Sequence, residues 1–179
     1  MILLRAAVTA GLLALSAGQA GVVAAPVKTP TAAPSAGPSA AQARTLYYPV
    51  AADAPKVLEK ALARAAASTA KAVIVFGADW CHDSRALGEV LTSAAFKSEF
   101  GNRFDVTFID VGRPQTGSGH NLDLVQRLGV KNLKSTPALF VLRADGKLLN
   151  GKKDAVSWRN AESRGTDTVL AWFRGFDKK

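Results

Sequence analysis

The chain has little of two residue types that often define a site, with one cysteine and two histidines among 179 residues. A disulfide bond within the chain needs two cysteines, so none can form, and stability depends on packing alone. Cys81, His82 and His120 are the soft metal ligands, and only the first two are close in sequence. Zinc sites usually show paired ligands at short spacing. We therefore predict that the chain holds no metal.

Long runs of basic residues are also missing, although the formal net charge is +9. Lysines and arginines are spread along the chain, and the adjacent pairs are Lys152 with Lys153 and Lys178 with Lys179. No aromatic residues alternate with a basic cluster, as they do on many nucleic-acid-binding surfaces. The sequence predicts a solvated basic surface and no nucleic-acid partner, with weak attraction to anionic envelope surfaces as the alternative.

The N-terminal segment has the features of an export signal. Arg5 precedes an uncharged apolar stretch over 6–18, and small residues follow it. We predict a secretory signal peptide over 1–25, cleaved after Ala20 or around 24–25. An uncleaved membrane anchor is the alternative, but many alanines and glycines make a poor anchor. The expected location is periplasmic or secreted, with no stable membrane insertion after cleavage.

A stretch of low complexity follows the predicted signal. Over 26–43 the composition is dominated by alanine, proline, serine, threonine and glycine, which cannot build a core. Four prolines recur at four-residue steps: Pro26, Pro30, Pro34 and Pro38. We predict a disordered linker over 26–43 and a folded domain over 44–179.

The folded part alternates between helical and strand patterns. Asp53 can cap a helix whose apolar positions recur up to residue 65. The continuous apolar run over 72–76 predicts a central strand that is buried on both faces. Further strands are expected over 103–111 and 138–142, the latter followed by an Asp-Gly hairpin turn into 148–149.

Further helices are expected after Cys81, after Ser93 as a cap, after Asn121 as a cap, and from Thr166 or Asp167. Residues 112–119 form a glycine-rich loop. The segment 158–164 is either a loop anchored in the core by its tryptophan or part of a groove near the site.

The cysteine stands where a strand passes into a helix, within Trp80-Cys81-His82-Asp83-Ser84. A thiol at the start of a helix faces unpaired backbone N–H groups and the positive end of the helix dipole, which stabilise its thiolate. His82 adds to this effect when protonated, whereas the neighbouring carboxylates oppose it. Reactivity is expected here, and a small buried hydrophobe is the alternative.

The apolar strand, the Trp80-Cys81 helix start and the later Thr136-Pro137 pair before 138–142 together resemble the thioredoxin superfamily. The resemblance covers the chain from about residue 53 and implies an α/β fold, a thioredoxin-like three-layer sandwich with a mixed central sheet flanked by helices. In that family a Cys-x-x-Cys motif begins the helix, beside a proline in a cis peptide bond. Here Ser84 replaces the second cysteine, and Val75 stands where two-cysteine members carry a buried acid.

The resemblance also implies the site. Ser84 is expected to donate a hydrogen bond to the thiolate, while Thr136 and a cis Pro137 position the backbone of a partner. Trp80 is expected beside the sulfur, and His82 is either a contact to the partner or a solvated residue in the middle of the motif. The predicted catalytic residues are Cys81, Ser84 and Pro137, and the predicted substrate-binding residues are Trp80, His82 and Thr136.

Two functions follow from the missing second cysteine. The first is exchange by one thiol, in which Cys81 forms mixed disulfides with protein thiols or disulfides and an external thiol such as glutathione releases them. The second is a non-catalytic binding or chaperone-like module of the cell envelope that keeps the fold and the groove. No bound cofactor is expected in either case. The chain is expected to be a monomer or a dimer linked through Cys81.

Overall fold

The computed structural model describes residues 44–176. The predicted signal peptide over 1–25 and linker over 26–43 lie outside the described residues. Among residues 44–176, no helix combines the length and the apolar character that crossing a membrane requires.

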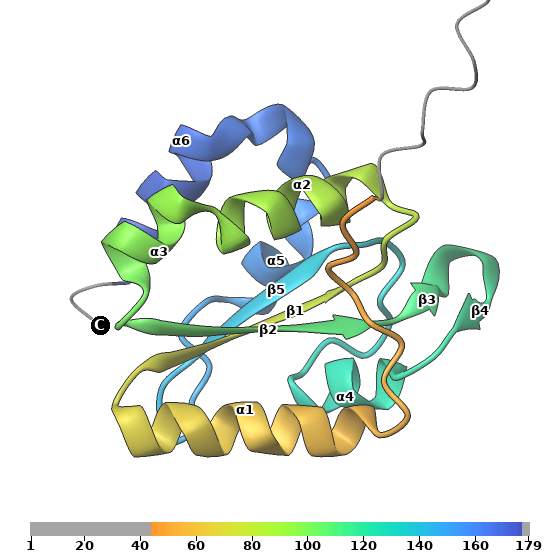
Figure 1. Ribbon diagram of the computed structural model, residues 1–179. Coiled ribbons are helices and arrows are strands. Elements are labelled where there is room, and N and C mark those ends of the chain that lie inside the picture. Colours follow the sequence, from red (N-terminus) through yellow and green to blue (C-terminus); the bar gives the residue numbers. More distant parts are fainter. Residues whose placement is uncertain (1–43, 177–179) are drawn as a thin grey trace, which may run out of the picture. The chain divides into compact units, whose positions relative to one another are not determined.

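The described part is a mixed α/β unit in which strands and helices alternate (Figure 1). Its strands are β1 (Lys71–Gly77), β2 (Phe104–Asp110), β3 (Gly112–Arg113), β4 (Ser118–Gly119) and β5 (Ala138–Leu142). Its α-helices are α1 (Ala54–Ser68), α2 (His82–Thr92), α3 (Ala94–Phe100), α4 (Leu122–Arg127), α5 (Lys152–Ala155) and α6 (Ala161–Arg174). Two short 3-10 helices, η1 (Pro114–Thr116) and η2 (Val156–Trp158), complete the order.

The main sheet has the order β2-β1-β5. Strand β1 runs parallel to β2, with Lys71 opposite Phe104, and antiparallel to β5, with Val75 opposite Leu139. The parallel pair needs a crossover, which α2 and α3 provide. All but the first residue of β1 are buried, as the continuous apolar run predicts for a central strand covered on both faces.

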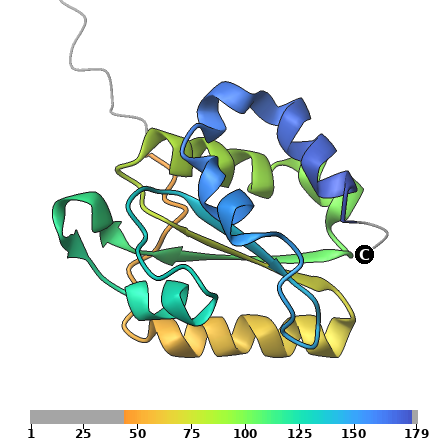
Figure 2. The same ribbon diagram turned by 180° about the vertical axis from the view of Figure 1, so that it is seen from behind.

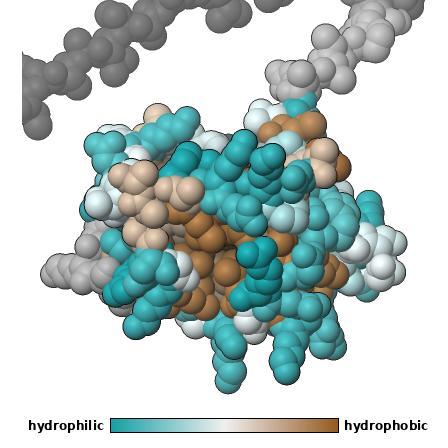
Figure 3. Space-filling model, turned by 90° about the horizontal axis from the view of Figure 1, so that it is seen from below, coloured by the Kyte–Doolittle hydropathy of each residue, from teal (hydrophilic) through white to brown (hydrophobic). Residues whose placement is uncertain are grey.

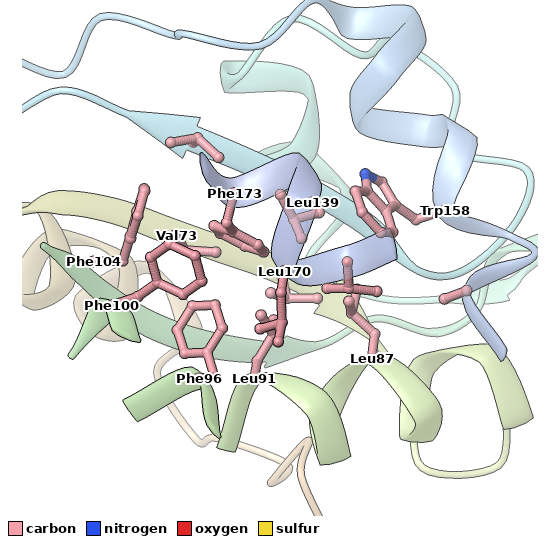
Figure 4. Packing of buried hydrophobic residues seen from close by; sticks show 14 of the residues in the cluster. Val73, Leu87, Leu91, Phe96, Phe100, Phe104, Leu139, Trp158, Leu170 and Phe173 are labelled. Atoms are coloured by element: carbon pink, nitrogen blue, oxygen red, sulfur yellow. The ribbon is translucent and has the colours of Figure 1, made fainter. Parts of the chain in front are cut away.

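Helices cover both faces of this sheet, so the predicted three-layer sandwich with a mixed sheet is confirmed. Figures 1 and 2 show α2, α3 and α6 on one face and α1 and α4 on the other. On the first face, phenylalanine rings interlock edge to face, as Figure 4 shows; the centroids of Phe96 and Phe173 are 4.9 Å apart. Burying each such ring contributes roughly 1.5–3 kcal/mol.

The second core lies between the sheet and α1 with α4. It is built from aliphatic and alanine side chains together with Phe76 and Phe140. Seen from the side of α1, apolar surface lies between polar side chains (Figure 3). The small residues Ala61 and Ala65 are wholly buried, so α1 packs close against the sheet.

Local capping signals explain where two of the helices begin. The Asp53 carboxylate accepts from the backbone N–H of Lys56 at 3.0 Å, and Pro55 occupies the first turn of α1. Ser93 Oγ accepts from the N–H of Phe96 at 3.1 Å and so starts α3 directly after α2. Both caps were predicted from the sequence, and both are confirmed.

The structure corrects the predicted cap at Asn121. This residue has a left-handed backbone, with φ of 55°, and makes no capping bond. Its side-chain amide instead donates to the backbone carbonyl of Asp110 at 2.9 Å. The residue ties α4 to the end of β2, a long-range use of an amide that local spacing does not indicate.

Three other expectations are refined. Residues 112–119 are not only a loop, because β3 and β4 pair across η1 as a short hairpin. After the turn at Gly146, the chain returns to β5 through a bridge from Leu148 to Leu142 and not through a full strand. Helix α6 begins at Ala161 and kinks at Gly165, so the predicted start at 166–167 corresponds to its second part.

Candidate functional site

Cys81 is the N-cap of α2, directly beyond the turn that leaves β1. Its N–H donates to the carbonyl of Ala78 at 3.0 Å, and its own carbonyl accepts from Arg85 at 3.1 Å. Its backbone is extended, as is usual for an N-cap residue. The N-cap position places its side chain at the start of an 11-residue helix. The first N–H groups of that helix have no acceptor within it, and the sulfur lies at the same end of the helix.

The sulfur contacts the loop that contains the predicted cis proline. Cys81 Sγ donates to the carbonyl of Thr136 at 3.4 Å, and the Thr136–Pro137 peptide bond is cis. The residue is 7% exposed, so its sulfur is buried. The thiol that the sequence predicts to be reactive is therefore not openly presented to solvent. It is nevertheless held against the proline loop, the position that the family resemblance implies.

Ser84 does not make the predicted bond to the sulfur in this structure. It is wholly buried, and its Oγ has no hydrogen-bond partner. Thr136 Oγ1 is likewise buried and unpartnered. An unsatisfied buried hydroxyl costs about 1–3 kcal/mol. Two such donors therefore occur close to Cys81. Ser84 is the third residue after it, and Thr136 is the residue whose carbonyl accepts its S–H.

The segment around Tyr47 and Tyr48, which we call the strap, packs against this site. The sequence did not predict this contact. The Asp79 carboxylate accepts from the backbone N–H groups of Tyr47 and Tyr48 at 2.9 and 3.0 Å. The phenol of Tyr48 donates to the carbonyl of Ser84 at 3.0 Å. The available signal was the tyrosine pair after the proline-rich stretch, together with an aspartate two residues before the cysteine.

Tyr48 is tightly fitted. A Cβ atom placed on Gly77 would lie 2.5 Å from its ring, so the turn after β1 requires glycine there. Burial raises the pKa of Tyr48 well above its ordinary value, and negative charge on Cys81 raises this pKa further. The phenol therefore stays protonated near the sulfur and keeps its bond to Ser84.

Trp80 packs on the β3–β4 hairpin. Its indole N–H donates to the carbonyl of Gly112 at 2.9 Å, and the guanidinium carbon of Arg113 lies 4.7 Å from its ring centroid. The side chain remains 38% exposed. The tryptophan that precedes the cysteine in sequence is thus held at the surface against an arginine of the hairpin.

His82 is the most solvated member of the predicted site, with 64% of its side chain exposed. Its Nε2 lies 3.3 Å from Asp83 Oδ2 and 3.9 Å from Glu162 Oε2. Asp83 itself is buried and accepts from the backbone N–H of Glu162 at 3.0 Å, so it caps α6. These contacts match the solvated alternative for His82.

The remaining candidates lie apart from one another. His120 Nε2 is 2.5 Å from Asp110 Oδ2, at the base of the hairpin. Within residues 44–176, no three His, Cys, Asp or Glu side chains gather closely enough to hold a metal. Trp158 is wholly buried beneath the guanidinium of Arg164, 4.3 Å from its ring centroid. Trp158 thus anchors the segment 158–164 in the core, as one alternative predicted, but residues 161–164 form the start of α6 and not a loop.

The fold has a counterpart of known structure. The chain is similar to the crystal structure of a disulphide isomerase from Xylella fastidiosa Temecula1, with a TM-score of 0.64 and 31% sequence identity. The match covers 73% of this chain and 96% of that chain. No protein-family model and no curated protein matches the chain. The identity, the shared fold and the helix-capping cysteine beside a cis proline show that the chain belongs to the thioredoxin superfamily.

Proposed function

We propose that this is an exported thiol–disulfide exchange protein that works through one thiol, Cys81. The observation that carries the proposal is the position of that sulfur, at the N-cap of α2 and 3.4 Å from the carbonyl of Thr136. The likeness to a disulphide isomerase supports thiol–disulfide exchange in general. The missing second cysteine supports the restriction to one thiol.

The exchange consists of two displacements. In the first, the Cys81 thiolate attacks one sulfur of a partner disulfide, a mixed disulfide forms, and the other partner sulfur leaves as a thiolate. In the second, a thiolate attacks the partner sulfur of the mixed disulfide, and Cys81 leaves as a thiolate. The protein is neither oxidised nor reduced over the cycle. When the second thiolate belongs to the same partner molecule, the net result is disulfide isomerisation.

The site residues support these steps in different ways. The helix N–H groups stabilise the thiolate both as nucleophile and as leaving group. The hydroxyls of Ser84 and Thr136, which have no partner in the structure, are available to donate to it. The backbone around Pro137 offers a short edge along which an extended partner segment can pair. Trp80 and His82, both exposed, border the approach.

Protein thiols and disulfides are the proposed partners, and glutathione is a candidate external thiol for the second displacement. Ser84 cannot perform that displacement, because a hydroxyl does not displace a thiolate from a disulfide. The mixed disulfide therefore lasts until a second thiolate arrives. We place the protein in the periplasm or outside the cell, because the N-terminal sequence has the pattern of a cleaved leader and disulfides persist in such compartments.

The test uses a small secreted protein whose disulfides have been scrambled, in a glutathione buffer. Wild type is expected to speed recovery of the native pairing and to form a mixed disulfide at Cys81 that mass spectrometry detects. The Cys81→Ser variant is expected to do neither, while its circular dichroism spectrum and melting temperature match those of wild type to show that it folds. Equal recovery with both proteins would refute the proposal.

A second candidate is a non-catalytic binding module, favoured by the burial of the sulfur at 7% exposure. The rate of mixed-disulfide formation with glutathione disulfide separates the two functions. Exchange predicts that folded protein reacts faster at neutral pH than the same chain unfolded in urea, because folding supplies the helix terminus. The binding module predicts slower reaction in the folded state, because the fold shields the sulfur.

A further inference from the structure

A basic cavity lies beside the chain that leads into the proline loop. It has a volume of about 380 Å³ and is formed by the segment between α4 and β5 together with α5 and η2. These segments face the viewer in Figure 2. Five of its lining residues are cations: Lys131, Lys134, Lys152, Lys153 and Arg159. No carboxylate lines it.

The charge of these cations is not neutralised within the described part of the chain. The ion pairs found there join other residues, such as Arg64 with Asp105 and His82 with Asp83, and none includes a cation of the cavity. Like charges held together at a surface repel one another, and an anion bound among them removes that repulsion. The cavity therefore has the electrostatic character of an anion site.

The backbone of the fold shapes the cavity together with its lysine side chains. Gly129 ends α4 with φ of +94°, and a Cβ atom built there would lie 2.5 Å from Cε of Lys152. The alkyl stem of this lysine thus packs over the glycine, which places its ammonium at the cavity. Val130, Leu133 and Val156 add an aliphatic lining. A site lined by both aliphatic groups and cations suits acidic side chains that carry methylene groups.

The cavity also lies close to the sulfur along the chain. Ser135 lines it, and the next residue is Thr136, whose carbonyl accepts the S–H of Cys81. An extended segment paired along this loop spans about 3.3 Å per residue, so positions a few residues from its cysteine reach the cavity. The aromatic side chains that would stack nucleic-acid bases are absent from the residues lining the cavity.

We propose that this cavity binds acidic side chains next to the reacting cysteine of a protein partner, and so selects acidic substrates. The proposal rests on the proposed exchange at Cys81, whose substrate class it specifies. The cations come from two segments, 131–134 and 152–159, and only the fold brings them together.

The test compares two synthetic peptides, each with one cysteine carried as a 2-pyridyl disulfide. Three glutamates precede the cysteine in the first, and glutamines replace them in the second. Attack by Cys81 releases 2-thiopyridone, whose absorbance gives the rate. For the full chain at low salt, we expect the acidic peptide to react about tenfold faster, the lower end of electrostatic steering. In about 1 M salt, where the Debye length is about 3 Å, the ratio is expected to fall toward one.

Two charge-matched variants locate the effect. Lys131→Gln with Lys134→Gln is expected to abolish most of the preference. Lys56→Gln with Lys60→Gln removes the same charge from exposed positions on α1, and this variant is expected to keep the preference for the acidic peptide. Equal rates for the two peptides, or an equal loss of preference in both variants, would overturn the inference.

A binding experiment separates this inference from the proposed function. Fluorescence anisotropy measures binding of the same acidic peptide, with serine in place of cysteine, to the Cys81→Ser protein. Binding that depends on Lys131 and Lys134, without any peptide exchange at Cys81, would keep the acidic site and reject the exchange. The protein could instead bind phosphatidylglycerol vesicles through Lys131 and Lys134 and fail to bind the peptide. That result would assign the cavity to a membrane surface and reject the inference.

Discussion

At the scale of single residues, the site depends on groups whose hydrogen bonds are incomplete. The hydroxyls of Ser84 and Thr136 are buried without partners, and Cys81 donates to a carbonyl. Such groups usually cost stability, and under the proposed exchange the two hydroxyls gain an acceptor when the thiolate forms. A thiolate at Cys81 would be an acceptor where the structure now has unsatisfied donors.

Ser84 provides a direct test, because it occupies the position of a second thiol. Ser84→Cys supplies a thiolate that attacks the mixed disulfide, releases the partner thiolate and leaves an internal disulfide to Cys81. We expect the mixed disulfide with glutathione to become shorter-lived by tenfold or more, since the attack is intramolecular. Ser84→Ala is the control, and its mixed disulfide should persist as in wild type. Equal lifetimes in all three proteins, followed by mass spectrometry, would contradict this geometry.

Tyr48 provides a second test, of stability. Tyr48→Phe removes the bond from the phenol to the carbonyl of Ser84 and is expected to lower the free energy of unfolding by about 0.5–1.5 kcal/mol. Tyr47→Phe is the matched control and is expected to change it by less than about 0.5 kcal/mol. Urea denaturation of both variants checks the difference. An effect of the same size in both would show that the Tyr48 bond contributes nothing.

The raised pKa of Tyr48 gives this difference a pH dependence. Folded Tyr48 keeps its proton at a pH where the same tyrosine in the unfolded chain, with its ordinary pKa of 10.0, loses it. The unfolded state then binds fewer protons, so stability falls as pH rises above 10, by up to about 1.4 kcal/mol per pH unit. Tyr48→Phe lacks this loss. The stability gap between wild type and variant should therefore narrow above pH 10, and a constant gap in urea melts would argue against the shift.

At the scale of elements, local signals located the central strand and the starts of α1 and α3. The caps at Asp53 and Ser93 involve neighbours three residues away, and the run over 72–76 is apolar on both faces, so each carries its own information. The strap was missed because Asp79 holds Tyr47 and Tyr48 across more than 30 positions. Contacts of that length leave no periodic pattern in a sequence.

The kink in α6 depends on the backbone conformation of one glycine, Gly165. Gly165 has φ of 71° and ψ of 163°, a backbone region that is nearly exclusive to glycine. Open space surrounds the position of its missing Cβ, so Gly165→Ala tests backbone strain alone, with an expected loss of about 1–3 kcal/mol. Gly151→Ala is the control, because Gly151 is also uncrowded but has an ordinary φ of −70°. Equal melting temperatures for the two variants would rule out strain at the kink.

At the scale of the whole molecule, the sequence predicted the sandwich, the cis proline and the helix-start cysteine, but not their surroundings. Burial of Cys81 depends on the proline loop, which lies 55 positions along the chain. The basic cavity joins two segments about 20 positions apart. Both features arise from packing between distant segments, which composition and spacing do not encode.

Charge and burial together decide between the two oligomeric states that the lone cysteine allows. Two copies that each carry a formal charge of +9 repel, and a bond between them must join two sulfurs that are each 7% exposed. A small disulfide avoids the repulsion between two cationic proteins and needs less room to reach the buried sulfur. We therefore expect glutathione disulfide to convert the protein mainly into a monomeric mixed disulfide, seen on non-reducing gels and by mass spectrometry. A band of doubled mass that disappears in Cys81→Ser would show instead that the sulfur reaches a second copy, and that the fold leaves it more accessible than its burial indicates.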